Sequence, residues 1–354
     1  MAFQQTPLIG PNRIQKLIAS FNGDLEAAWN APATRLASTV GERIAEQVVK
    51  TREELDLAGI IERIEKLGQT VIAFDDPRYP QLLKETTAPP LVLYVEGSIE
   101  TEDDLSIAVV GSRESTPYGR DVARMISGDL ATGGVTVVSG LARGIDGVAH
   151  EAALAAGGRT IAVLAGGVDW IYPSEHKGLA RRIRDHGALI SEYPPKTRPV
   201  PRNFPARNRI MAGLSSGVVI VEARIKSGTL ITANYAAHYN REVFAVPGSV
   251  LSPASSGCHH LLREGACLAT SAADILKELQ LESLATGQDV AEDTTPVTPE
   301  EKAILSSLTI EPQHIDDLAV LVERPIHEVA TLLMMLELQG RVRNAGAQHY
   351  ARTR

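Results

Sequence analysis

Four turns rich in glycine, serine and arginine are the segments of this sequence with the clearest chemistry. Each follows a short apolar run and leads into a helical pattern, at residues 110–113, 139–146, 165–169 and 226–229. A strand that ends in Gly or Ser before a helix leaves main-chain N–H groups unpaired, and such groups favour anions such as phosphate. Because the turns would meet at one edge of a sheet, they predict a phosphate-binding crevice.

These turns contain most of the candidate ligands. Arg113 lies where a helix is predicted to begin, so its guanidinium would clamp a phosphate with two parallel hydrogen bonds, unless it is only a surface arginine. Arg113 and Glu114 occupy the place of the second glycine in the dinucleotide fingerprint, so we expect no dinucleotide cofactor. The candidates in the turns are Gly111, Ser112, Arg113, Ser139, Gly140, Lys226, Ser227, Gly228 and Thr229.

The charge of the chain is unevenly distributed. The formal net charge is -8, but residues 107–282 hold 19 Lys/Arg against 15 Asp/Glu, and the remainder holds 16 against 28. Within residues 177–209 there are 9 basic and 2 acidic residues. Because the local field decides where a polyanion binds, this pattern predicts a nucleic-acid partner despite the acidic total.

An aromatic ring lies at the end of this basic window. Phe204 could stack on a base, which is worth about 1–3 kcal/mol per base in single-stranded nucleic acid. In the alternative interpretation, Phe204 packs into the core and Arg207 pairs internally with Glu192 or Glu222. The basic candidates of the window are Lys177, Arg181, Arg202, Arg207 and Arg209.

Patterns for catalysis and metal binding are sparse. Asp146 is well placed to cap a helix. Cys258, His259, His260 and Cys267 have metal-ligand side chains but no paired Cys-x-x-Cys spacing, so we expect no metal. The chain has neither a nucleophile elbow nor a Walker lysine motif. These observations favour a binding protein over an enzyme.

Composition points to a cytoplasmic protein of two or three domains. The chain has 354 residues, of which 44% are hydrophobic and 22% charged, as in ordinary globular proteins. It has no apolar run of about 18 residues and no secretory signal pattern, so we expect no membrane contact. Its 2 cysteines do not form a disulfide framework, which fits a reducing compartment.

Strands and helices alternate through the centre of the chain, with a further strand predicted at residues 91–95. Apolar runs that alternate with helical patterns at 118–132, 147–156, 175–186 and 230–240 are typical of a parallel sheet covered on both faces. The fold class predicted is therefore α/β, an extended Rossmann-like doubly wound parallel sheet. Its predicted buried strands are 107–110, 135–138, 160–164, 188–191, 217–221 and 243–246.

The flanks of this region differ from it in composition. We expect a small helical domain at 1–70, of the SAM or helix-hairpin-helix kind, and the extended Rossmann domain at 71–282. An acidic linker at 283–298 would lead to a winged-helix-like domain at 299–354. The third helix predicted in that last domain, 326–338, has no Lys or Arg, which favours a protein contact over reading of DNA.

Several motifs, taken together and in order, resemble those of the DprA (Smf) family over about residues 75–280. They are Gly-Ser-Arg at 111–113, Ser-Gly-Leu-Ala-Arg-Gly-Ile-Asp at 139–146, Phe-Pro-x-Arg-Asn-Arg at 204–209, Ser-Gly-Thr-Leu-Ile-Thr-Ala at 227–233 and Val-Pro-Gly at 246–248. The resemblance implies an extended Rossmann domain that binds single-stranded DNA, forms homodimers and loads RecA during natural transformation.

The resemblance also implies roles for particular residues. Gly111, Ser112 and Arg113 would line the DNA pocket, with Phe204 and Lys226 beside it. Relatives often carry a Lys where this chain has Pro201, and Arg202 is the neighbour that could replace it; His176 stands where many relatives have Asn. The region 257–263 would fall near the dimer and RecA-facing surface, although Leu262 could equally be a core residue. The candidates for that surface are His259, Leu262 and Arg263.

Two other functions remain open at this point. One is an enzyme of the lysine-decarboxylase-like group, which cleaves nucleoside monophosphates through a Pro-Gly-Gly-x-Gly-Thr-x-x-Glu motif. In this chain Thr232 stands where that carboxylate is expected, and the Pro-Gly-Gly is absent, so no general acid is evident. The other is a nucleotide sensor that uses the C-terminal domain as its output.

Overall fold

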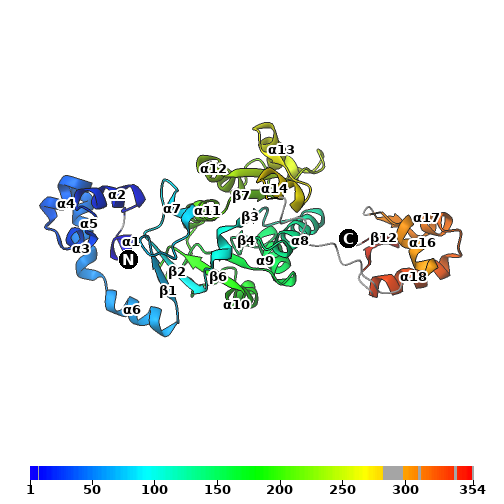
Figure 1. The fold of residues 1–354 in the computed structure, drawn as a ribbon, viewed down its shortest axis with the longest axis horizontal. Helices are drawn as coiled ribbons and strands as arrows, with labels where there is room; N and C mark the ends of the chain where they lie inside the picture. The colour runs from blue at the N-terminus through cyan, green and yellow to red at the C-terminus, as the bar shows by residue number, and fades with distance from the viewer. Residues whose placement is uncertain (7, 282–297, 310–311, 339–340, 353–354) are drawn as a thin grey trace. The chain divides into compact units, whose positions relative to one another are not determined.

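The computed structural model describes residues 1–354 except 7, 282–297, 310–311, 339–340 and 353–354. The chain divides into two compact units, Met1–Gln288 and Asp289–Arg354 (Figure 1). The first unit contains both the N-terminal helices and the sheet. The bounds of the four segments predicted from the sequence stay a prediction.

A nine-stranded sheet organises the first unit (Figure 1). Its order is β1-β2-β6-β5-β4-β3-β7-β8-β9. The strands β6, β5, β4, β3, β7, β8 and β9 pair in parallel. At one edge, β2 pairs antiparallel with β6, and β1 pairs antiparallel with β2. The predicted fold class is confirmed. The strands are β1 Thr70–Ala73, β2 Val92–Gly97, β3 Ser106–Val110, β4 Thr136–Ser139, β5 Thr160–Val163, β6 Gly187–Ser191, β7 Gly217–Ile220, β8 Glu242–Ala245 and β9 Cys267–Leu268.

The sheet has a core on each face because successive strand residues point to opposite sides. In β3, Ile107 and Val109 pack in the cluster that includes α8, α9 and α14, whereas Ala108 and Val110 pack in the cluster that includes α11, α12 and α13. Every residue of β3 to β7 is buried, which explains the unbroken apolar runs. These helices are α8 Pro117–Thr132, α9 Ile145–Ala155, α11 Asn203–Leu214, α12 Thr229–His238, α13 Ser256–Arg263 and α14 Ala272–Glu278.

The connections leaving β3 and β7 diverge, although these strands are neighbours. The chain after β3 enters α8 on one face, whereas the chain after β7 enters α12 on the other. Such a switch point leaves a crevice beyond the carboxyl ends of the strands, where α/β proteins bind ligands.

Short helices form most of the N-terminal segment of this unit. Leu17, Leu36 and Val48 are fully buried in a cluster of their own, and Ile14 and Ile64 pack with residues of the sheet edge such as Tyr94. The remaining helices of the unit are α1 Ala2–Gln5, α2 Pro11–Ser20, α3 Leu25–Asn30, α4 Ala33–Val40, α5 Glu42–Glu54, α6 Leu57–Lys66, α7 Gln81–Lys84 and α10 Lys177–Asp185.

The second unit has the three helices and terminal strand pair expected of a winged helix. Ile304, Leu318, Val329, Leu333 and Leu336 form its own buried core. A short strand that the sequence did not predict, β10, adds to the pair. The elements are α16 Pro299–Ser307, β10 Gln313–His314, α17 Ile315–Leu321, α18 Ile326–Leu338, β11 Val342–Gly346 and β12 His349–Arg352. Across both units, none of the helices that the structure describes is long and apolar enough to cross a membrane.

Candidate nucleic-acid interface

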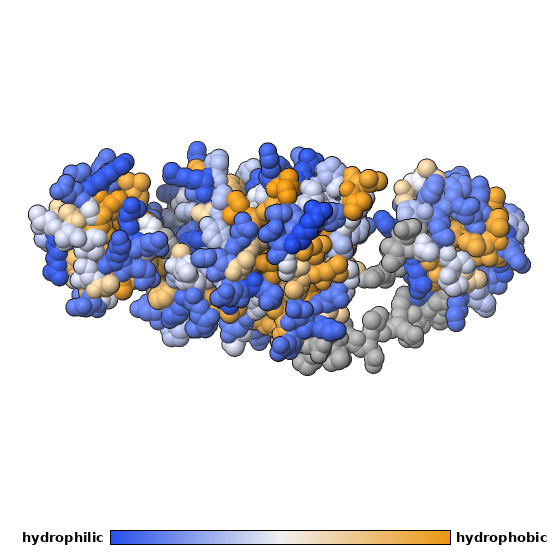
Figure 2. All heavy atoms as spheres, turned by 90° about the horizontal axis from the view of Figure 1, so that it is seen from above, coloured by the Kyte–Doolittle hydropathy of each residue, from blue (hydrophilic) through white to orange (hydrophobic). Residues whose placement is uncertain are grey.

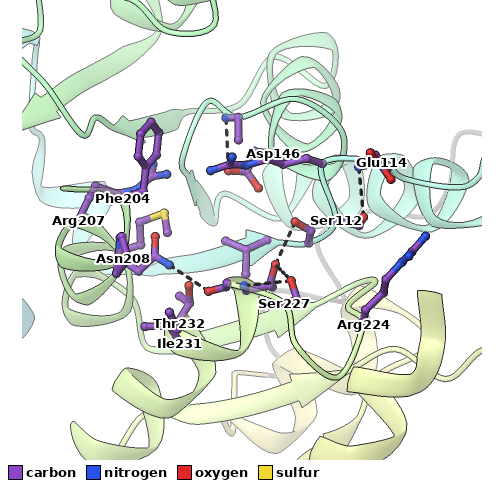
Figure 3. Close-up of a pocket in the computed structure, with 18 of the residues that line it drawn as sticks. Ser112, Glu114, Asp146, Phe204, Arg207, Asn208, Arg224, Ser227, Ile231 and Thr232 are labelled. Carbon is purple, nitrogen blue, oxygen red and sulfur yellow. Dashed lines mark hydrogen bonds between the residues drawn. The ribbon is translucent and has the colours of Figure 1, made fainter. Parts of the chain in front are cut away.

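A hollow of about 660 Å³ lies at the switch point of the sheet (Figure 3). We call it the crevice. Its walls are the loop after β3 (111–114), the start of α9, one face of α11 and the loop after β7 (224–229). Phe204, Asn208 and Met211 line it from α11 because residues four and seven positions apart share a helix face. The crevice is therefore built from segments that are far apart in the sequence.

A cation and two rings meet at the mouth of the crevice. The guanidinium of Arg113 lies 5.2 Å from the centre of the Phe204 ring, and the Tyr172 ring meets Phe204 edge-on at 5.8 Å. Arg113 and Tyr172 are exposed, and Phe204 is partly exposed. Among the described residues, no carboxylate lies within 4.0 Å of the Arg113 guanidinium. Its charge is therefore free for an anion beside a surface on which a base could stack.

A hydrogen bond joins the two loops, 111–114 and 224–229, that form opposite parts of the wall, and a second one lies within the first loop. The Thr229 hydroxyl donates to the carbonyl oxygen of Gly111 at 3.1 Å, and the Ser112 hydroxyl accepts from the Glu114 N–H at 3.2 Å. Within the described part of the chain, the main-chain N–H groups of Ser112, Arg113 and Gly228 have no hydrogen-bond partner. Lys226 and Arg224 are exposed at the rim. The first and fourth turns thus present N–H groups and cations, as an anion site requires.

In the second turn, several main-chain N–H groups already donate to acceptors within the protein. The Asp146 carboxylate accepts from the N–H groups of Gly140 at 3.2 Å and Ala142 at 3.4 Å, and the Ser112 carbonyl accepts from Ile145 at 3.2 Å. The N-cap of α9 is Gly144, whose φ of 77° suits glycine. The expectation that Asp146 caps this helix was therefore wrong: it lies inside the helix and braces the preceding turn.

The third turn, unlike the second, contributes no residue to the lining of the crevice. The N–H of Gly167 donates to the Thr197 carbonyl at 2.9 Å, and a Cβ at Gly166 would lie 2.7 Å from the same oxygen. The chain before α11 therefore covers this turn. Of the four turns predicted to converge on phosphate, the first and fourth line the crevice with free N–H groups.

Arg207 is a buried charged residue in the wall of the crevice. Its side chain is buried, donates to the Val163 carbonyl, and lies so close to Gly140 that a Cβ there would be 2.1 Å from Nη1. Burial lowers the pKa of Arg207 to about 10 and raises that of the nearby Asp146, while each group's charge favours the ionised form of the other. Arg207 therefore supports the crevice from within.

Two expectations from the basic window need correction: the carboxylate partners of Arg207 and the exposure of Arg209. Arg207 pairs with neither Glu192 nor Glu222; Arg209 pairs with Glu192, and the Thr116 N–H donates to Glu222 at 2.9 Å. Arg209 is itself buried, because its guanidinium also donates to the carbonyl of Ala88. Neither arginine is a surface cation.

Other candidates lie away from the lining of the crevice. Ser139 is buried and donates to the Val109 carbonyl at 2.7 Å, so its hydroxyl serves the sheet. Lys177 and Arg181 are exposed on α10, and Arg202 is exposed just before α11, but none of the three lines the crevice. Sequence reasoning missed Tyr172, Asn208 and Arg224. Phe204 and Asn208 are four residues apart, so a helix predicted over this segment would have placed Asn208 on the same face as Phe204.

The candidates for a dimer or partner surface lie on α13. Arg263 is exposed, whereas Leu262 is half-buried against a core cluster. His259 Nε2 lies 3.1 Å from the Gly248 carbonyl oxygen. Among the described residues, no group of three or more His, Cys, Asp or Glu is arranged to hold a metal.

His150, on helix α9, is fully buried, and its burial should make the free energy of unfolding depend on pH. Its Nδ1 lies 2.7 Å from the Thr160 hydroxyl, which itself donates to the Val137 carbonyl, so Nδ1 is the donor to Thr160. Burial lowers the pKa of His150 to about 3. Below about pH 6.5, the His150 imidazole is therefore protonated in the unfolded chain, whereas it stays neutral in the folded chain down to about pH 3.

We expect His150 to decrease the free energy of unfolding as the pH falls from about 6.5 towards 3, by up to about 1.4 kcal/mol per pH unit. Urea unfolding at several pH values should show a shallower pH dependence for His150→Asn. His186→Asn, which replaces an exposed histidine, is the control and should keep the wild-type slope. Equal slopes for all three proteins would contradict the prediction.

The sequence matches two family models in order along the chain. One, "DNA recombination-mediator protein A", matches residues 70–280, and the other, "DprA winged helix domain", matches residues 288–347. The chain belongs to the DprA (Smf) family. The family and the winged helix predicted from the sequence are thereby confirmed.

Individual members of the DprA family agree with this assignment. Protein Smf of Synechocystis is 34% identical over 389 residues, covering 99% of this chain and 98% of that protein. The X-ray structure of DprA from Streptococcus pneumoniae superposes with a TM-score of 0.71 at 36% identity, covering 78% of this chain and 95% of that one. A DprA structure from Helicobacter pylori, described for its single-stranded DNA binding mode, gives a TM-score of 0.54 at 30% identity, covering 60% and 95%.

Proposed function

We propose that this chain is a non-enzymatic recombination mediator that binds single-stranded DNA in the crevice. The observation that carries the proposal is the unpaired Arg113 guanidinium, which faces the Phe204 ring at the mouth of the crevice. A phosphate and a neighbouring base of one strand could be held there together, because stacking needs an unpaired base. The DNA binding described for the Helicobacter pylori relative supports the same chemistry.

Each part of the strand has a partner in this proposal. Bases stack on Phe204 and Tyr172, whose rings meet edge-on. Phosphates bind Arg113 and the N–H groups of the first and fourth turns, and Lys226 extends the charge along the rim. A duplex buries its base faces in its own stack, so we expect it to bind more weakly than a single strand.

Membership of the family supports a proposal about the cellular role. We propose that the protein protects incoming DNA and loads RecA during natural transformation, acting as a cytoplasmic homodimer. The family description as a recombination mediator supports this role. His259, Leu262 and Arg263 are the residues we propose for the dimer or RecA contact, and exposed Arg263 is the most accessible of them.

Fluorescence anisotropy of a labelled oligo-dT and a matched duplex, titrated across a salt series, tests DNA binding. We expect preference for the single strand and a log–log salt slope that, divided by about 0.7, counts the phosphates contacted. Absence of binding at low salt would remove DNA from the proposal. Incubation with AMP tests the rival enzyme: Thr232 is buried where a catalytic carboxylate would be needed, so we expect no base release.

The winged helix gives a prediction about partners. Helix α18 carries Glu328 and Glu337 and no Lys or Arg, while Ile326, Met334 and Met335 are exposed on it. We therefore expect that deleting residues 299–354 leaves the affinity for oligo-dT within about twofold, because the domain contributes few phosphate contacts. RecA loading onto the same oligonucleotide should fall. Equal loading with and without the domain would contradict a partner role in that step.

A further inference from the structure

Two adjacent apolar side chains protrude from a turn next to the crevice. Val250 and Leu251, the apolar tip, are 85% and 90% exposed. They are the central residues of a turn closed by the Ser252 N–H, which donates to the Ser249 carbonyl at 3.0 Å. Such positions usually hold Gly, Asn, Asp, Ser or Pro, and neither turn geometry nor packing requires a branched apolar residue here. On the face seen in Figure 2, hydrophobic side chains are exposed at several separate places on a mostly hydrophilic surface.

The base of this turn is held firmly. The Tyr118 hydroxyl donates to the Pro247 carbonyl at 2.6 Å, and His259 Nε2 lies 3.1 Å from the Gly248 carbonyl oxygen. On the other side, the Ser252 carbonyl accepts from the Ser255 N–H at 3.1 Å. The apolar tip is thus presented on an anchored support.

The same support is bonded to the rim of the crevice. The Ile225 N–H donates to the Ser256 hydroxyl at 3.2 Å, and the Gly257 N–H donates to the Ala223 carbonyl at 2.7 Å. Ile225 lies between Arg224 and Lys226, the exposed cations of that rim. The segment that contains the turn and its support, residues 247–257, has no charged residue. A polyanion held by the rim would therefore pass beside an uncharged, protruding tip.

The apolar tip is too small to form a protein interface by itself. A stable protein interface buries about 800 Å² on each side, far more than two side chains at a narrow turn provide. Apolar side chains of this size are, however, large enough to insert between neighbouring bases and unstack them.

We propose that Val250 and Leu251 form a wedge that unstacks the base pair at a junction between single-stranded and double-stranded DNA. The inference rests on the proposed binding of single-stranded DNA in the crevice. Binding of the freed strand along Arg224 and Lys226 supplies the driving force, so the wedge opens the end of a hairpin and needs no nucleotide hydrolysis.

A hairpin with a single-stranded dT tail and 2-aminopurine in the base pair next to the tail tests the wedge. The full-length protein should raise the 2-aminopurine fluorescence about threefold at saturation, because the base leaves the stack. Val250→Ser/Leu251→Ser, which suits the turn, should lose this rise while its affinity for oligo-dT stays within about twofold of wild type. Val250→Ile/Leu251→Met keeps two apolar side chains and should retain the rise.

The chain offers a matched control in Val320 and Leu321, another adjacent exposed pair, which is 77% and 59% exposed. Val320→Ser/Leu321→Ser should open the junction as wild type does. A full rise with Val250→Ser/Leu251→Ser, no rise with the wild type bound to the tail, or a change of oligomeric state on sedimentation of that variant would each overturn the wedge. Failure of the wild type to bind oligo-dT would instead overturn the proposed function.

Discussion

Arg113→Ala should weaken binding of oligo-dT by about tenfold to a hundredfold, or 1.4 to 2.8 kcal/mol in binding free energy. The substitution removes the only guanidinium that faces the Phe204 ring among the described residues. It also removes a cation that has no carboxylate within 4.0 Å among the residues that the structure describes. Anisotropy titrations at a fixed salt concentration measure the effect. Across a salt series, the log–log slope should become shallower by about 0.7 for each phosphate that the variant no longer neutralises.

A second cation over a ring provides the control for this variant. The Arg198 guanidinium lies 5.0 Å from the Trp170 ring centre, and neither residue lines the crevice. Arg198→Ala removes the same charge and the same kind of contact, and we expect an affinity within about threefold of wild type, since it leaves the crevice intact. An unchanged affinity for Arg113→Ala, or equal reductions for both variants, would contradict the site.

Arg207→Met should destabilise the first unit by about 1–3 kcal/mol, because a buried hydrogen bond is lost and a buried acidic partner loses a charge that favours its ionised form. The partner is Asp146, whose carboxylate is buried and holds the turn at Gly140 and Ala142. The Val163 carbonyl would also lose its donor. Urea unfolding followed by tryptophan fluorescence measures the destabilisation, since Trp29 and Trp170 both belong to this unit.

A double-mutant cycle separates the charge effect from the change in packing. Asp146→Asn/Arg207→Met should lose less stability than the sum of the two single variants, by about 0.5–3 kcal/mol, because neither charge is then left alone. Arg202→Met replaces an exposed arginine at the start of the same helix and should change stability by less than about 0.5 kcal/mol. Strict additivity of Asp146→Asn and Arg207→Met would contradict coupling between the two side chains.

The alternation of strands and helices was readable from local pattern alone. Strands such as 107–110 are buried on both faces, so their apolar runs have no polar interruptions, and the Gly-rich turns after them mark where each strand ends. Because parallel strands require crossover connections, the α/β class and its ligand-binding edge followed from the sequence. The motifs in the turns also identified the family.

Which residues of the turns and the basic window face a ligand was decided by tertiary packing. A count of charges in the sequence does not say which of the basic side chains are exposed. Arg207 and Arg209 lie on helix α11, where the sheet and the chain around Ala88 enclose them. Likewise, the N–H groups of Gly140 and Ala142 are taken by Asp146 within the second turn, and that of Ile145 is taken by the Ser112 carbonyl from the loop after the neighbouring strand.

The sequence by itself determined the central strands, the helices predicted between them, the order of the turns and the candidate ring and cations, but not the short strands β1, β9 and β10. The tertiary structure alone decided that Arg113 faces Phe204, a residue far away in the sequence, across the divergence of β3 and β7. It also decided that Val250 and Leu251 protrude beside the rim. The physical reason is that propensity and periodicity act over one or two turns of chain, whereas exposure and pairing depend on which distant segments pack together.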